Sequence, residues 1–191
     1  MTVENNNQSP APAKKQPSAF NKWWRAMPTI LGIAAVVLGL DTLTKLLVVT
    51  NLNLGDTWTV IPGLEPIFKF TFITNTGAAF GMFSQFGGLF TIIGVLVIGA
   101  IITLHHHLPT EIFWIRLSLG LLLGGAMGNF IDRISRGYVV DFIDIGFWPI
   151  FNIADLAIVC GVAILSYHLW DEEEETQAKA TVNEVTPLNP A

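Results

Sequence analysis

The chain has 191 residues, of which 51% are hydrophobic and only 13% are charged, and its mean hydropathy is +0.53. These values are typical of an integral membrane protein and exclude an ordinary soluble domain. The net charge of −5 does not indicate a basic partner, because five acidic residues lie in one run at 171–175. No basic stripe with interleaved aromatic residues occurs, so we expect no nucleic-acid partner.

Both ends of the chain are predicted to be disordered and cytoplasmic. The N-terminal segment is 1–27, where the first 19 residues have little apolar surface and four cations precede the first apolar stretch. The C-terminal segment, 171–191, is acidic and then polar, without periodicity. The residues between them, 28–170, are predicted to form one membrane domain.

The first apolar stretch, about Pro28 to Val49, is too long for a cleaved signal peptide and predicts a membrane helix. It carries Asp41 and Lys45, which are four residues apart and therefore share a face. Opposite charges at this spacing can pair, which lowers the cost of placing either near the membrane. We favour a pair that faces the functional site; the alternative is a structural pair, with the Lys45 ammonium group reaching to the interface.

A small sheet outside the membrane is predicted after this helix. Phe68, Phe70 and Phe72 alternate with polar residues, a period of two, and a Pro-Gly turn at 62–63 precedes them. We expect the phenylalanine face to pack against lipid or against the helix ends. The string at 75–81 has small residues that permit close backbone approach, and Asn75 offers an amide to a peptide or a carboxylate. A tight turn explains that string equally well.

Three more membrane helices are predicted at about 82–104, 112–131 and 151–169. The chain is therefore expected to be an all-α membrane protein with four transmembrane helices and a small extracytoplasmic β-sheet. Glycines at 120, 124 and 128 form a ridge for tight helix packing. The run His105–His107 is predicted to be a solvated loop and not a metal site. Cys160 is expected to be a small buried hydrophobe.

A loop is expected at 132–150, between the last two helices, and this loop and its flanks carry most of the polar chemistry. Ionisable groups near bilayer depth are costly, so their usual interpretation is a functional site. Residues 124–155 contain four aspartates, two arginines and two asparagines: Asp132, Asp141, Asp144, Asp155, Arg133, Arg136, Asn129 and Asn152. The predicted topology brings polar residues of four segments to one membrane level: Asp41, Lys45, Asn75, Asn129, Arg133, Asp141, Asn152 and Asp155.

The residues at that level favour chemistry by carboxylates. Every histidine is placed at the opposite end of the helices, which argues against a serine or cysteine nucleophile. No metal-binding spacing is found, so we expect no metal and no other cofactor. Two carboxyl groups that share one proton can hydrolyse a peptide, one activating water and the other protonating the carbonyl oxygen. The spacing alone does not decide which two aspartates these are.

Five motifs in order resemble the prolipoprotein signal peptidase family, also called signal peptidase II. They cover about Asp41 to Leu165, and the two termini lie outside the resemblance. The motifs are Asp-Thr-Leu-Thr-Lys at 41–45, Asn-Thr-Gly-Ala-Ala-Phe at 75–80, Gly-Asn-Phe-Ile-Asp-Arg at 128–133, Gly-Tyr-Val-Val-Asp-Phe at 137–142 and Phe-Asn-Ile-Ala-Asp at 151–155.

The resemblance implies an aspartic endopeptidase of the bacterial inner membrane that removes the signal peptide from diacylglyceryl-modified prolipoproteins, before the lipidated cysteine. By motif, Asp141 and Asp155 are the catalytic pair. Supporting or substrate-binding positions fall on Asn129, Arg133, Asn152 and Ala154, and further motif positions around the site fall on Asp41, Lys45, Asn75 and Gly77. The expected partners are the lipid-modified prolipoprotein and membrane lipids, and we expect a monomer with both termini cytoplasmic.

A non-enzymatic alternative is a small transporter or proton relay that uses the same carboxylates. Relays favour polar groups along the whole path and often internal repeats. The second predicted helix carries no charge and no repeat is visible, so we favour the peptidase.

Overall fold

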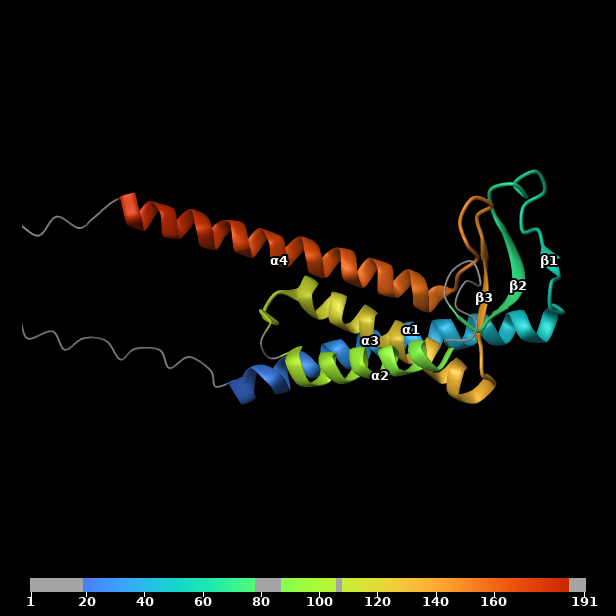
Figure 1. Cartoon of the computed structure of the whole chain (residues 1–191), viewed down its shortest axis with the longest axis horizontal. Coiled ribbons are helices and arrows are strands. Elements are labelled where there is room, and N and C mark those ends of the chain that lie inside the picture. The colour runs from blue at the N-terminus through green and yellow to red at the C-terminus, as the bar shows by residue number, and fades with distance from the viewer. Residues whose placement is uncertain (1–18, 78–86, 106–107, 186–191) are drawn as a thin grey trace, which may run out of the picture.

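The computed structural model describes the backbone of residues 19–77, 87–105 and 108–185. Four helices and a three-stranded sheet make up this part, and the sheet lies across one end of the helix bundle (Figure 1). We call this the sheet end, and the opposite end the termini end. The elements in order are α1 (Ala19–Asn51), β1 (Thr57–Trp58), β2 (Lys69–Asn75), α2 (Gly87–Leu104), α3 (Phe113–Arg136), β3 (Val139–Asp144) and α4 (Ile153–Val185).

Three helices are long and apolar enough to cross a membrane: α1 over Trp24–Asn51, α3 over Phe113–Arg136 and α4 over Ile153–Asp171. The apolar stretch of α2, Gly88–Thr103, is shorter. Three of the expected membrane helices are therefore found by length and composition, together with the small sheet, and the fourth span stays a prediction.

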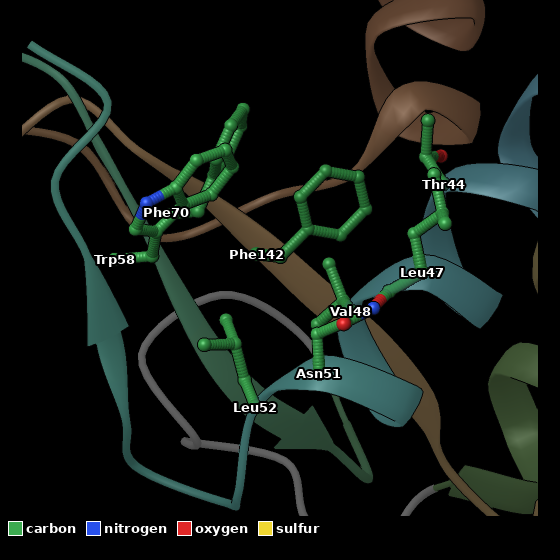
Figure 2. A pocket seen from close by; sticks show the side chains of 8 residues that line it. All are labelled: Thr44, Leu47, Val48, Asn51, Leu52, Trp58, Phe70 and Phe142. Carbon is green, nitrogen blue, oxygen red and sulfur yellow. The ribbon is translucent and has the colours of Figure 1, made fainter.

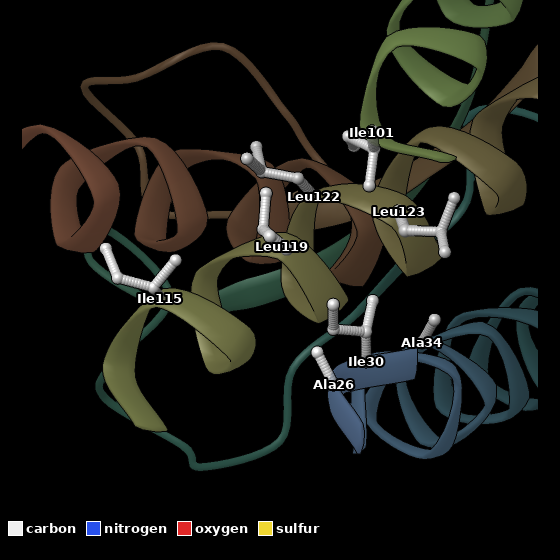
Figure 3. Close-up of a cluster of buried hydrophobic side chains, with 8 residues drawn as sticks. All are labelled: Ala26, Ile30, Ala34, Ile101, Ile115, Leu119, Leu122 and Leu123. Carbon is white, nitrogen blue, oxygen red and sulfur yellow. The ribbon is translucent and has the colours of Figure 1, made fainter. Parts of the chain in front are cut away.

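Helix α3 is the centre of the bundle, because 61% of its span is buried, against 22% for α1 and 17% for α4. Its glycines explain how close its neighbours lie. A Cβ at Gly120 would lie 2.6 Å from Ile33 Cβ of α1, and one at Gly125 would lie 2.5 Å from the Ala154 carbonyl oxygen of α4. The predicted small-residue ridge is thus a packing surface for α1, and a second ridge faces α4. Buried apolar side chains of α1, α2 and α3 pack against one another in one cluster between these helices (Figure 3).

The sheet has the order β1-β2-β3, and both pairs are antiparallel. Phe72 and Phe142 are buried together with Val48 of α1. The predicted phenylalanine face therefore packs against a helix end, the second of the two expected arrangements. Strand β3 lies in the segment that the sequence predicts to be a loop. Its sequence, Val-Val-Asp-Phe-Ile-Asp, lacks the regular alternation of apolar and polar residues that indicates a strand, because five of its six residues are buried.

Several predicted boundaries were wrong. Helix α1 starts at Ala19 and α4 continues to Val185, so part of each end expected to be disordered is helical. The extension of α4 is rich in Glu, Gln, Ala and Lys, which are strong helix formers. Helix α3 runs five residues past the expected Ile131, to a left-handed Gly137 with φ of 80°. The rest of the predicted disorder lies outside the described residues.

Two side-chain predictions were also wrong. His105 is buried, and its Nδ1 lies 3.1 Å from the carbonyl oxygen of Ile102, so this histidine is not part of a solvated loop. His106 and His107 lie outside the described residues. Cys160 is exposed rather than buried, on a part of α4 where Leu156 and Val159 are exposed as well.

Candidate active site

The two aspartates chosen by motif meet at the start of α4, where one residue contacts both. Asn152 is the N-cap of α4: its side-chain oxygen accepts a 2.9 Å hydrogen bond from the Asp155 backbone N–H. In return, the Asp155 carboxylate accepts a 3.2 Å bond from the Asn152 backbone N–H. This reciprocal arrangement is a capping box, written in the sequence as Asn-Ile-Ala-Asp. It fixes the Asp155 carboxylate at the positive end of the helix dipole.

The Asn152 amide nitrogen then donates a 2.7 Å hydrogen bond to Oδ1 of Asp141 on β3. The other carboxylate oxygen of Asp141, Oδ2, accepts a 2.8 Å bond from Asn75 of the neighbouring strand β2. Asp141 is 1% exposed. Burial, and next the charge of Asp155, raise the pKa of Asp141 to about 7, although Asn75, Asn152 and Lys45 oppose the shift. One carboxyl of the pair is therefore suited to keep a proton near neutral pH.

Asn75 and Gly77 form a turn that aims the Asn75 amide. The Gly77 backbone N–H donates a 3.0 Å hydrogen bond to the Asn75 side-chain oxygen. With that oxygen occupied, the amide NH₂ group of Asn75 points to Asp141. Asn75 and Gly77 are thus part of a turn and also support the site, while residues 78–81 of the predicted string lie outside the described residues.

Asp155 is held from the side of α3 by Asn129, whose amide nitrogen donates a 2.7 Å hydrogen bond to its Oδ1. The Asn129 oxygen accepts two bonds of 3.1 Å, one from the Asn152 amide and one from the Lys45 ammonium group. Two donors on the oxygen leave the nitrogen facing the carboxylate. The orientation of Asn129 is therefore set by its partners.

Lys45 joins the groups beneath the pair. Its Nζ lies 2.7 Å from the Asp41 carboxylate and 2.9 Å from that of Asp132, and it is 1% exposed. Arg136 approaches the other oxygen of Asp132 at 3.3 Å. The four groups are two anions and two cations, so they balance within the site. The structural alternative, in which Lys45 reaches for the interface, is wrong.

The remaining carboxylate contacts tie the helices together. Asp41 Oδ1 accepts a 3.0 Å hydrogen bond from the Ala154 backbone N–H, which links α1 to α4. Gly128 leaves room for this carboxylate, because a Cβ there would overlap Asp41 Oδ2. Asp132 Oδ2 accepts a 3.2 Å bond from the Val140 N–H, which links α3 to β3. The sequence predicted Gly128 only as part of the helix-packing ridge, and it did not predict the contacts of Asp132, although Asp132 lies i+3 from Asn129 and i−4 from Arg136.

Arg133 is the cation beside the pair. Its Nη1 donates a 3.4 Å hydrogen bond to the Asn129 carbonyl oxygen, and its Cζ lies 5.8 Å from the centre of the Phe90 ring. It interacts electrostatically with Asp155 and Asp141. Within the part of the chain that the structure describes, no carboxylate lies within ion-pair distance of it. Its charge is thus available to offset the pair of aspartates or to meet a bound substrate.

All ten residues selected from the sequence therefore lie in one network. The same structure describes no group of three or more His, Cys, Asp or Glu side chains that could hold a metal, in the residues searched. The chemistry of the set is that of two carboxylates with amide donors and one nearby guanidinium. This arrangement can take a proton from water at one carboxylate and give one to an acceptor at the other.

An apolar hollow of about 530 Å³ lies beside the site but faces away from it (Figure 2). Phe142 lines it, and because Phe142 follows Asp141 in β3, the two side chains point to opposite faces of the sheet. The polar side chains in its wall bond to their own helix, as Thr44 does to the Leu40 carbonyl oxygen at 2.8 Å. The hollow is lined by Thr44, Leu47, Val48, Asn51, Leu52, Trp58, Phe70 and Phe142.

Comparisons with known proteins find similar proteins that cover most of the chain. The family model described as signal peptidase (SPase) II matches residues 33–171. A lipoprotein signal peptidase of Moorella thermoacetica is 43% identical over 143 residues, which are 75% of this chain and 93% of that protein. One from Anoxybacillus flavithermus is 41% identical over 157 residues, covering 80% of this chain and 91% of the relative.

A solved structure, described as a bacterial membrane enzyme at 2.3 Å resolution, superimposes with a TM-score of 0.67. It is 34% identical in sequence and covers 78% of this chain and 91% of its own. A second, at 1.9 Å resolution, has the same TM-score with 35% identity, over 74% of this chain and 92% of its own.

Proposed function

Because the chain belongs to the signal peptidase II family, we propose that it is a membrane-embedded aspartic endopeptidase that removes the signal peptide from diacylglyceryl-modified prolipoproteins. The cut falls before the lipidated cysteine. The observation that carries the aspartic type is the contact of one buried residue, Asn152, with both Asp141 and Asp155. The transporter or proton relay has no support in the family relationship.

In the proposed reaction the pair holds one proton. Asp141 keeps it, because burial and the neighbouring charge raise its pKa to about 7, and Asp155 is then the partner that acts as the base. Asp155 takes a proton from water as the water oxygen attacks the scissile carbonyl carbon, and Asp141 gives its proton to the carbonyl oxygen. The C–N bond of the resulting diol then breaks, the leaving nitrogen receives a proton from Asp155, and Asp141 recovers its own from a hydroxyl of the diol.

The surrounding residues hold each carboxylate in position. Asn75 and Asn152 donate to Asp141, while Asn129 donates to Asp155, so neither carboxylate can rotate away. With one shared proton the pair carries one negative charge, which Arg133 offsets. The ion pairs of Lys45 and Arg136 with Asp41 and Asp132 contain two cations and two anions, so they add no net charge to the site. The site therefore stays close to neutral as substrate binds.

We further propose four spans, with α2 as the fourth, in the bacterial inner membrane. Four cations, at 14, 15, 22 and 25, precede or begin the first span, which favours cytoplasmic termini. The sheet and the aspartate pair are then extracytoplasmic, where lipoprotein precursors emerge. We propose that the domain of residues 28–170 acts as a monomer.

The function is tested by incubating the purified full chain in lipid vesicles with a precursor peptide that carries a diacylglyceryl cysteine. We expect cleavage directly before the modified cysteine, identified by mass spectrometry, and little cleavage of the same peptide without the lipid. Equal cleavage of both peptides, or of neither, would contradict the proposed substrate class.

A further inference from the structure

Exposed aromatic side chains mark one end of the membrane spans. At the termini end they are Trp24 of α1 at 57% exposure, Trp114 of α3 at 51% and Trp170 of α4 at 69%. Tryptophan and tyrosine are enriched at membrane interfaces, because the apolar ring contacts the lipid chains while its polar edge contacts the headgroups and water. The termini end therefore has the aromatic belt expected where helices leave the bilayer.

At the sheet end, the described parts of the helices carry no such belt. Among the described residues, the exposed aromatic side chains at that end are Trp58, Phe147 and Trp148, and all three belong to the sheet or its loops. The helices α1 and α3 end there in Asn51 and Arg136.

Two loops of the sheet form one apolar tip. The loop 61–67 touches the loop 145–149, since a Cβ at Gly146 would overlap the Pro66 carbonyl oxygen. Both loops reach the same edge and project beside the helix bundle, past the start of α4 (Figure 1). We call their four large exposed apolar residues the apolar tip: Phe147 at 86% exposure, Trp148 at 61%, Ile67 at 61% and Ile61 at 50%.

The tip is held at the level where α4 begins. Phe151 and Ile143 exchange backbone hydrogen bonds of 2.7 and 3.1 Å, so Phe147 and Trp148 lie at the end of a closed hairpin. Ile153, the first residue of the α4 span, follows directly after that hairpin. Loop backbone does not enter hydrocarbon, because its polar groups would lose their partners. The side chains can therefore reach the interface, while the hairpin backbone stays among the headgroups.

We propose that the apolar tip is a membrane anchor that inserts into the interface of the leaflet at the sheet end, with phospholipid as its partner. The hairpin of the tip runs into the membrane span of α4 at Ile153, so the tip lies beside a membrane-spanning helix, and this position selects lipid over another protein. An exposed apolar group of this size on a soluble surface would invite aggregation, whereas beside a bilayer it is covered. The anchor holds β3, the strand that carries Asp141, against the membrane. The proposal does not depend on the peptidase activity.

The test places an environment-sensitive NBD fluorophore on a cysteine at residue 147 or, as a control, at residue 54. Leu54 is also strongly exposed, at 63%, but lies beyond the end of α1 and away from the tip. Both variants, Phe147→Cys and Leu54→Cys, carry Cys160→Ser and are reconstituted in phosphatidylcholine–phosphatidylglycerol vesicles, with or without brominated acyl chains. Because all three side chains are exposed, these changes leave the packing intact.

We expect the label at 147 to emit at shorter wavelength and to lose most of its fluorescence with brominated lipid, while aqueous iodide has little effect. The label at 54 should show the reverse. Quenching of residue 147 by iodide and not by bromine would overturn the proposal. Protection of residue 147 that persists in detergent and rises with protein concentration would overturn it as well, because a second copy would then cover the tip.

Discussion

Replacing Lys45 by methionine tests whether the buried charge network supports the aspartate pair. Methionine keeps most of the length of the side chain but leaves the carboxylates of Asp41 and Asp132 without the cation between them. Removing one partner of a buried ion pair costs about 3–5 kcal/mol, whereas a partly exposed pair contributes about 0–1 kcal/mol. The matched control is Lys69→Met, whose ion pair with Asp144 is longer, at 3.5 Å, and has a side chain 31% exposed.

The same change should reduce catalysis in the protein that remains folded. Without Lys45 the Asn129 oxygen loses one of its two donors, so the amide is free to turn away from Asp155. A hydrogen bond to a charged group contributes about 1.5–3 kcal/mol, which is about a tenfold to hundredfold loss of single-turnover rate. Neutralising a carboxylate in the same background, as in Lys45→Met with Asp132→Asn, should recover part of the stability.

The assay is reversible unfolding in mixed micelles, paired with single-turnover cleavage of a lipidated precursor at equal folded concentration. Lys45→Met should unfold far more readily than Lys69→Met and cleave more slowly. If the two variants were equally stable and both cleaved at the wild-type rate, the network would have no supporting role and this reasoning would be refuted.

Three further outcomes are expected. Gly128→Ala should lower the thermal unfolding temperature and the cleavage rate, because the added methyl group meets the Asp41 carboxylate. Gly99→Ala, which has open space around its Cβ, should be neutral in both assays. Equal unfolding temperatures of the two variants would contradict the packing argument. Turnover should fall about tenfold per pH unit as the pH rises above about 7, because the aspartate pair then loses its shared proton; the pKa of Asp141 is raised to about 7. A turnover rate that still increases above that pH would contradict a shared proton in the mechanism. Deleting residues 1–18 and 172–191 should leave cleavage within a few-fold of wild type, since these segments offer little apolar surface to a packed core and the described contacts of the site come from other residues. Complete loss on the same peptide assay would assign a tail to function.

The sequence was most informative where a local pattern has one structural meaning. The i, i+4 spacing of Asp41 and Lys45 predicts their contact, and they do pair, at 2.7 Å. The Asn-Ile-Ala-Asp string at 152–155 has the pattern of a helix start, and this start places Asp155. Helix propensity and spacing are local properties, so these features do not depend on the rest of the fold.

Tertiary contacts account for what the sequence did not predict. Strand β3 has no alternating pattern, because five of its six residues are buried, with α1 and α3 in contact with it, so the sequence predicts a loop there. Asp132 was placed in that loop, yet it lies in the last turn of α3 and accepts a bond from Val140 across the following turn. The choice of Asp141 over Asp144 also depends on pairing, since it follows from which side of β3 meets Asn152.

The most direct test of the central claim is single-turnover cleavage by Asp141→Asn and Asp155→Asn, with Asp144→Asn as the control. Asparagine keeps the shape but cannot exchange a proton, so each of the first two variants should lose at least about 10²–10⁴-fold in rate, and the double variant should be little worse. Asp144 bonds within the sheet, to Thr71 and Gly146, and its variant should keep measurable activity. Substantial cleavage by folded Asp141→Asn or Asp155→Asn would contradict the assignment of this pair and the mechanism built on it.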